Sequence, residues 1–321
     1  MSRDKMAHWV CLYVGEELGR YGFPEGHPFG TDRQQKFLNE AKAQGLTEKA
    51  SLKSPVKATR EEIERFHSAV YVDRVIALSQ SGMGYLDEGD TPAFAGMYDA
   101  SAYVVGSALD GLHRVMRGEC QRTFQAIGGL HHARRTRAAG FCVFNDLGVV
   151  IETLRSEYKV RRVAYVDIDV HHGDGVFYSY DQDPDLIFVD LHEDGRFLYP
   201  GTGGANETGE GKAAGTKLNI PMPPGAGDEE FVEQWERAEA HLKKFKPEFF
   251  ILQCGADSLE GDPLAHLRYS EKAHAHAARR LCKLADEFAK GRIMGFGGGG
   301  YDRRNLARAW SAVLREFIEA N

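Results

Sequence analysis

The segment VDIDVHHGDG (166–175) decides the fold prediction, because it places a dense group of polar residues directly after an apolar run. That run, RRVAYVDI (161–168), has the length and residue types typical of a buried strand. Three aspartates and two histidines lie within the eight residues 167–174. Ligands of α/β proteins bind beyond the carboxyl ends of parallel strands. The segment therefore predicts a parallel sheet with a functional site at this edge.

Further apolar runs of strand length alternate with longer segments of helical periodicity. We predict strands at 9–14, 122–127, 161–168, 185–191, 216–220, 248–254 and 292–296. We predict helices at 99–118, 145–158, 229–245 and 270–291, with Ser270 and Asp302 as N-caps. This alternation favours an α/β fold with a mostly parallel sheet covered on both faces. No repeat or linker interrupts it, so we expect one domain over residues 1–321.

The composition excludes several classes of protein. The chain has 321 residues, a net charge of -7 and 42% hydrophobic residues, which is typical of a globular protein without a basic surface for nucleic acid. Five scattered cysteines without CxxC spacing indicate neither a disulfide framework nor a thiolate zinc site. No apolar stretch is long enough to span a membrane, and no cleavable leader is visible. We expect a cytoplasmic protein with no nucleic-acid or membrane partner.

Polar motifs follow five of the predicted strands. They are GGLHHARRTRAAGF after 122–127, DVHHGDG after 161–168, HEDGRFLYPGTG after 185–191, GADSLEGDP after 248–254 and GGGGYDRR after 292–296. Because the carboxyl ends of parallel strands meet at one edge of a sheet, we expect these motifs to form one active site.

A metal site is the first feature that these motifs predict. Asp167, Asp169 and His171 alternate along the chain, so an extended backbone places them on one face. If Asp257 supplies another oxygen, two carboxylates and one imidazole meet with a coordination position left open, which is typical of catalytic zinc. The alternative is that these residues only cap strand ends by hydrogen bonding. The polar groups at the other strand ends favour the metal site.

The tandem histidines and a glycine-flanked tyrosine predict the remaining chemistry. His131 and His132 can act as base and acid near neutral pH, with Asp167 and Asp174 orienting their rings. The glycine run before Tyr301 lacks the ending of a phosphate loop, and the tyrosine hydroxyl can hydrogen-bond an oxyanion. With no GxSxG motif and no candidate nucleophilic cysteine, a metal-bound water is the predicted nucleophile.

Taken together, the motifs GGLHHARRTRAAGFCVFND, YVDIDVHHGDG, LHEDGRFLYPGTG, QCGADSLEGDP and GGGGY resemble the zinc-dependent histone deacetylase superfamily. The likeness extends upstream through GHPFGTDR, EEIERFHSAVYVDRV and GDTPAFAGMYDA, and is strongest to bacterial acetoin-utilisation deacetylases and acetylpolyamine amidohydrolases. It implies the arginase/deacetylase fold, a single α/β domain around an eight-stranded parallel sheet. It also implies hydrolysis of N-acetyl amides, of acetyl-lysine or acetylpolyamines, to acetate and a free amine.

The resemblance assigns roles to individual residues. Asp169, His171 and Asp257 are the implied zinc ligands. His132 is the implied general base, with Asp174 behind it. His131 is its implied electrostatic partner, with Asp167 behind it. Tyr301 is the implied group that polarises the acetyl carbonyl. A potassium ion is implied beside the zinc, at Asp167, Asp190 and Leu191, although Asp190 stands where some relatives have serine.

Further residues are implied to contact the substrate or product. Gly140, Phe141 and Tyr199 would line the tunnel, Asp90 would hold the substrate backbone, and Arg33 would lie near the acetate-release channel. Tyr199 departs from the phenylalanine of many relatives. Leu264 stands where a polyamine-selective relative has glutamate, which argues against that selectivity. Glu17, beside Glu16, can recognise a distal ammonium or simply be solvated, and we expect broad acetyl-amine activity.

Two other functions stay open at this point. Assembly into a homo-oligomer stays open as well. A ureohydrolase with two manganese ions shares the fold, but the tandem histidines and GGGGY favour one metal with acid and base residues. A non-catalytic module that binds acyl-lysine would keep the fold, but every expected catalytic position is filled here.

Overall fold

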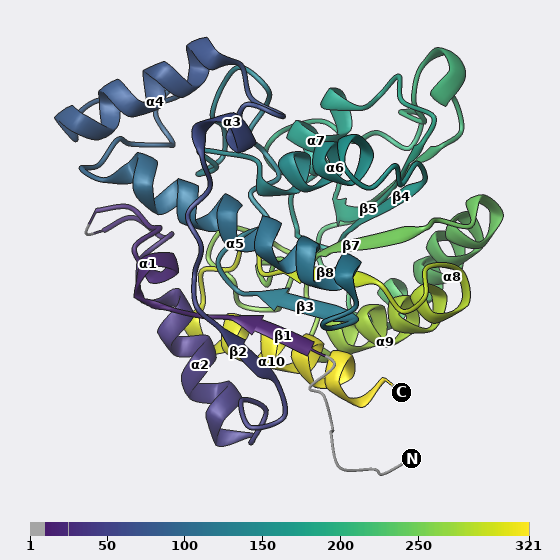
Figure 1. Cartoon of the computed structure of the whole chain (residues 1–321). Helices are drawn as coiled ribbons and strands as arrows, with labels where there is room; N and C mark the ends of the chain where they lie inside the picture. Colours follow the sequence, from purple (N-terminus) through teal and green to yellow (C-terminus); the bar gives the residue numbers. More distant parts are fainter. Residues whose placement is uncertain (1–9, 25, 321) are drawn as a thin grey trace.

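The computed structural model describes residues 10–24 and 26–320, and its centre is one eight-stranded sheet (Figure 1). The strands are β1 (Val10–Tyr13), β2 (Ser51–Lys53), β3 (Arg122–Gln125), β4 (Val163–Asp167), β5 (Leu186–Glu193), β6 (Lys217–Met222), β7 (Phe249–Gln253) and β8 (Ile293–Phe296). They are ordered β2-β1-β3-β8-β7-β4-β5-β6, and every neighbouring pair is parallel. The predicted α/β class and eight-stranded parallel sheet are confirmed.

Helices cover both faces of the sheet. They are α1 (Glu16–Gly19), α2 (Arg33–Ala43), α3 (Arg60–Ile63), α4 (Ala69–Ser81), α5 (Met97–Arg117), α6 (Asp146–Ser156), α7 (Asp174–Ser179), α8 (Asp228–Phe245), α9 (Glu271–Phe288) and α10 (Arg303–Glu319), with a 3-10 turn at Gly211–Ala213. Helices α3 to α7 lie on one face, and α2, α8, α9 and α10 lie on the other (Figure 1). None of the described helices is long and apolar enough to cross a membrane.

The alternation of side chains along β4 divides the core into two layers. Val163 and Tyr165 pack into the layer that contains α5 and α6, whereas Ala164 and Val166 pack into the layer that contains α9 and α10. All four side chains are completely buried. Burial on both faces explains why the strands of this parallel sheet are continuous apolar runs.

The predicted strands and N-caps agree with the structure, with one strand missed. Ser270 accepts a hydrogen bond from the backbone of Lys272, and Asp302 caps α10 in the same way. The strand predicted at 9–14 begins at Trp9, which lies outside the described residues. The missed strand is β2, a three-residue edge strand whose partly exposed side chains give no apolar run. Helices α2 and α4 were also not predicted from periodicity.

Candidate active site

The predicted site residues follow four adjacent strands in the middle of the sheet. His131 and His132 follow β3, Tyr301 follows β8, Asp257 follows β7, and the segment that contains His171 follows β4. Neighbouring positions in the sheet bring these carboxyl ends together. Residues as far apart in the sequence as His131 and Tyr301 therefore meet at one edge.

The three predicted metal ligands converge. Asp169, His171 and Asp257 are buried, and one ligand atom of each lies within 4.8 Å of the other two. Nδ1 of His171 lies 3.1 Å from Oδ1 of Asp169 and 3.2 Å from Oδ2 of Asp257. Within the described part of the chain, Oδ2 of Asp257 has no hydrogen-bond partner. A buried carboxylate oxygen without a donor is suited to bind a cation, and two oxygens with one imidazole nitrogen fit zinc.

Two glycines allow the backbone to approach these carboxylates. A Cβ atom at Gly255 would lie 1.9 Å from Oδ2 of Asp169, and one at Gly299 would lie 2.0 Å from Oδ2 of Asp257. The backbone N–H of Gly299 and the side-chain amide of Gln253 both donate to Oδ2 of Asp169, each at 2.9 Å. Glycine is needed here because any side chain would displace the carboxylates.

The electrostatics of the triad favour a positive charge between its members. Burial lowers the pKa of His171, but its interactions with Asp169 and Asp257 outweigh burial and raise the pKa to about 10. Burial and the charge of Asp169 raise the pKa of Asp257 to about 6. These opposing shifts favour binding of a cation at the triad.

The rings of the two tandem histidines lie next to each other, tilted by 55°, and each has a carboxylate behind it. Their Nε2 atoms are 3.1 Å apart. His131 donates from Nδ1 to Oδ2 of Asp167 at 2.8 Å, and His132 donates from Nδ1 to Oδ1 of Asp174 at 2.7 Å. Each carboxylate fixes the tautomer of its ring and leaves Nε2 facing the other histidine.

The surroundings of His132 favour its neutral form. Burial and the neighbouring His131 lower the pKa of His132 to about 4, against the opposite effect of Asp174. Arg134 holds the second oxygen of Asp174 at 2.8 Å, and the two hydrogen-bond donors keep the pKa of this carboxyl well below its usual range despite burial. A neutral, buried imidazole can accept a proton at pH 7.

Tyr301 and Arg33 occupy the β8 side of the site. Burial and the carboxylates Asp257 and Asp169 raise the pKa of Tyr301 well above its usual value, so the hydroxyl remains a hydrogen-bond donor. Asp262 positions this residue by accepting from its backbone N–H at 2.8 Å. Arg33 is fully buried and donates to the backbone oxygens of Gly298 and Gly300, while its Nη1 has no partner among the described residues.

The predicted tunnel residues lie directly beside this machinery. The ring of Tyr199 packs 5.2 Å from that of His132, and the ring of Phe141 packs 5.9 Å from that of Tyr301. A Cβ atom at Gly140 would lie 2.4 Å from the ring of His132. Phe141 has a positive φ of 67°, which is a strained conformation for a side chain of this size.

The remaining predicted substrate contacts lie farther out. Asp90 and Tyr199 line a cavity of about 480 Å³. Leu264 is partly exposed in the loop after β7. Glu17 is half-buried in α1.

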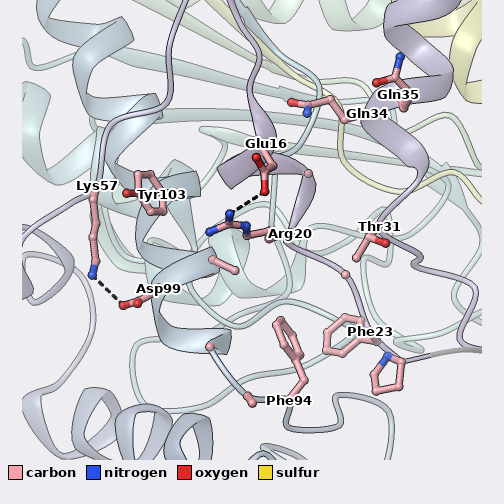
Figure 2. Close-up of a pocket in the computed structure, with 16 residues that line it drawn as sticks. Glu16, Arg20, Phe23, Thr31, Gln34, Gln35, Lys57, Phe94, Asp99 and Tyr103 are labelled. Atoms are coloured by element: carbon pink, nitrogen blue, oxygen red, sulfur yellow. Dashed lines mark hydrogen bonds and ion pairs between the residues drawn. The ribbon is translucent and has the colours of Figure 1, made fainter.

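A larger cavity, of about 970 Å³, lies between α1, α2 and the start of α5 (Figure 2). Ion pairs between Glu16 and Arg20 and between Lys57 and Asp99 lie along it. None of the predicted metal ligands lines this cavity. Glu16 and Glu17 are the acidic pair considered for recognition of an ammonium, and Glu16 already forms an ion pair with Arg20.

The residues predicted to bind potassium lie behind the histidine pair. Asp167 and Asp190 are opposite each other on β4 and β5, and both are completely buried, as is Leu191. Asp190 accepts from the backbone N–H of Gly173 at 2.9 Å and from His192 at 2.7 Å. Burial and the neighbouring charge of Asp190 raise the pKa of Asp167 well above its usual value. Two adjacent buried carboxylates favour a cation between them.

Some residues that support the site were not predicted. Gln253, Asp262 and the two glycines lie within the quoted motifs, but no individual role was assigned to them, because they act on the backbone or on a carboxylate. His172 had no predicted role beyond supporting the turn; it interacts through Nδ1 with the hydroxyl of Thr202 at 2.8 Å.

Comparisons with known proteins agree with this architecture. Residues 27–317 match the family model described as histone deacetylase domain. The acetoin utilization protein AcuC of Bacillus subtilis (strain 168) is 35% identical over 307 residues, covering 92% of this chain and 79% of that protein. AcuC of Staphylococcus aureus (strain MRSA252) is 33% identical, covering 97% and 82%. The crystal structure of the HDA15 HD domain has the same fold, with a TM-score of 0.88, 24% identity, and 97% of this chain and 90% of that chain covered.

Proposed function

Because this chain belongs to the histone deacetylase family, we propose that it hydrolyses N-acetyl amides and releases acetate and a free amine. Family membership supports a deacetylase activity in general. The finer proposal is that the substrate is an acetylated lysine side chain or an acetylated polyamine. Both present an acetamide on an aliphatic chain, which suits the aromatic rings of Phe141 and Tyr199 that pack against Tyr301 and His132.

The metal that best fits the site is zinc. Asp169, His171 and Asp257 would hold it, and when bound it supplies Lewis acidity and lowers the pKa of a water molecule. The second cation that we propose, potassium, would neutralise Asp167 and Asp190. The support for zinc is the buried triad, in which Oδ2 of Asp257 is left without a hydrogen-bond partner among the described residues. The support for potassium is the pair of buried carboxylates opposite each other on β4 and β5.

The side chains of the chain itself would handle the protons. Neutral His132 accepts a proton from the attacking water at Nε2, and Asp174 stabilises the resulting imidazolium. The hydroxyl of Tyr301 donates a hydrogen bond to the carbonyl oxygen as negative charge develops on it. The histidine pair then returns a proton to the leaving nitrogen, and the unpartnered Nη1 of Arg33 is available to the acetate product.

The observation that carries this proposal is the position of a carboxylate-backed histidine pair next to the triad. The Nε2 atom of His131 is 3.9 Å from Oδ1 of Asp169. A purely structural metal site has no need for two buried imidazoles whose tautomers are fixed by separate carboxylates.

Acetate release by the zinc-loaded protein tests the proposal. We expect turnover of acetyl-lysine peptides and of acetylated putrescine, cadaverine and spermidine, with kcat/KM values within roughly tenfold of one another, since one methylene changes discrimination only modestly. Differences of orders of magnitude would reject broad specificity. Failure on every acylated amine with zinc bound would favour a binding module. Two transition metals per chain and turnover of guanidino compounds would favour a ureohydrolase.

A further inference from the structure

We propose that Asn145 and Asp146, which we call the α6 clamp, are positioning residues that set the geometry of the histidine pair. This inference rests on the proposed function. The clamp lies at the N-terminal end of α6 and reaches the loop 126–133, which carries the histidine pair. Neither residue contacts the predicted metal ligands.

Asp146 holds the part of the loop that precedes the histidines. Its Oδ2 accepts from the backbone N–H of Gly129, and its Oδ1 accepts from that of Leu130, both at 2.8 Å. The side chain is completely buried, and no Lys, Arg or His in the described chain forms an ion pair with it. Gly129 has a φ of 75°, so the two adjacent N–H groups point to one carboxylate.

Asn145 holds the part of the loop that follows. Its Nδ2 donates to the backbone oxygen of Ala133 at 2.8 Å and more weakly to that of His131 at 3.5 Å. Its Oδ1 accepts from the backbone N–H of Gly148 at 2.9 Å, which caps α6. One side chain thus serves two separable purposes: the oxygen caps the helix, and the nitrogen holds the loop.

The clamp completes the restraint of the histidine rings. Asp167 and Asp174 fix each ring through Nδ1, but these carboxylates lie at the end of β4 and the start of α7 and do not hold the backbone of the histidines. The clamp fixes that backbone on both sides of the pair. With ring and backbone both held, the Nε2 atoms stay 3.1 Å apart. Misplacing such groups by about 1 Å can cost about 100-fold in rate.

The burial of Asp146 supports a role beyond stability. A buried carboxylate with no counter-charge is expensive, and burial raises its pKa to about 6 even though it accepts two backbone hydrogen bonds.

Three variants of the zinc-loaded full chain test the clamp. Asn145→Ser retains an oxygen that can cap α6 but removes the donor to Ala133. Asp146→Asn replaces one acceptor with a donor that faces a backbone N–H. Thr153→Val is the matched control, because it removes the two hydrogen bonds of a buried hydroxyl on the same helix, to the backbone oxygen of Val149 and from Arg65, and neither partner belongs to the loop 126–133. We measure kcat, KM, zinc content and Tm for each.

We expect kcat to fall about tenfold in Asn145→Ser and about 100-fold in Asp146→Asn, with KM within twofold and one zinc per chain. Thr153→Val should lose Tm but keep kcat. If Asp146→Asn does not fold, Asn145→Ser decides the outcome alone. Unchanged kcat in the clamp variants, or an equal loss in Thr153→Val, would overturn the inference. Absence of turnover by the wild type would instead contradict the proposed function.

Discussion

Replacing Gly299 with alanine should abolish tight zinc binding without unfolding the protein. The φ of Gly299 lies outside the left-handed region, so its backbone accepts alanine and the effect is steric. The new Cβ atom would lie 2.0 Å from Oδ2 of Asp257, whereas real Cβ contacts are essentially never closer than 3.0 Å. The carboxylate must therefore move by at least the difference, 1.0 Å.

A movement of this size removes a ligand. Metal–ligand distances tolerate deviations of about 0.2 Å, so Asp257 could no longer bind the ion that Asp169 and His171 hold. Loss of a hydrogen bond to a metal ligand, with the ligand itself still in place, weakens metal affinity by about 10- to 100-fold. We therefore expect zinc affinity to fall at least about 100-fold, with acetate release falling in parallel.

Competition with a chelating dye measures the zinc affinity, and circular dichroism of the metal-free protein shows whether the variant folds. Gly227→Ala is the matched control, because the φ of Gly227 is -111° and an added Cβ would meet its nearest neighbour at 3.5 Å, an ordinary contact. The control should bind zinc as the wild type does. A folded Gly299→Ala protein with wild-type zinc affinity would refute the reasoning.

Three further outcomes are expected. Tyr301→Phe should lower kcat by about 100-fold or more while zinc binding is retained, because the oxyanion loses a donor; near-wild-type turnover with zinc bound would contradict this. Burial lowers the pKa of His67 to about 3, below its usual 6.5, so the unfolded chain binds more protons. The free energy of unfolding should therefore fall as pH decreases from 6.5 towards 3, by up to about 1.4 kcal/mol per pH unit from this residue. Urea titrations between pH 7 and 5 should show that the free energy of unfolding depends less steeply on pH in His67→Gln than in the wild type. An equal slope in the two proteins would rule out His67 as the source. Chelation should lower Tm, and added zinc should restore it, since free zinc at 1,000 times its Kd stabilises the folded state by about 4 kcal/mol; an unchanged Tm would contradict a zinc site.

The sequence was most informative where the structure depends on local pattern or on a particular residue type. The apolar run that became β4 was recognisable because both faces of the strand are buried. Asp169, His171 and Asp257 could be singled out as candidate ligands because few other roles suit carboxylates and imidazoles after buried strands. The location of these residues in one cluster followed from the parallel sheet.

The sequence was least informative where a residue acts through the backbone of a distant segment. Asp146 looks like an ordinary acidic residue in the first turn of a helix, although it holds a loop 16 to 17 residues earlier. Asp262 positions Tyr301 from 39 residues away by accepting from its backbone N–H. Gly299 was noted only as part of a glycine run, and its contact with Asp257 depends on the packing of β7 beside β8.

The place of β8 in the sheet has a consequence for how the protein becomes active during synthesis. β4 and β7 are direct neighbours, so the segments that carry the predicted metal ligands can meet before residue 293 is made. Within the sheet, β3, which precedes the histidine pair, pairs with β8 (Ile293–Phe296), which lies between β3 and β7. Such long-range pairing is slow to form. If the proposed function holds, a growing chain can thus form the predicted metal site before the full active site, and insertion of β8 is the step that completes the sheet between β3 and β7.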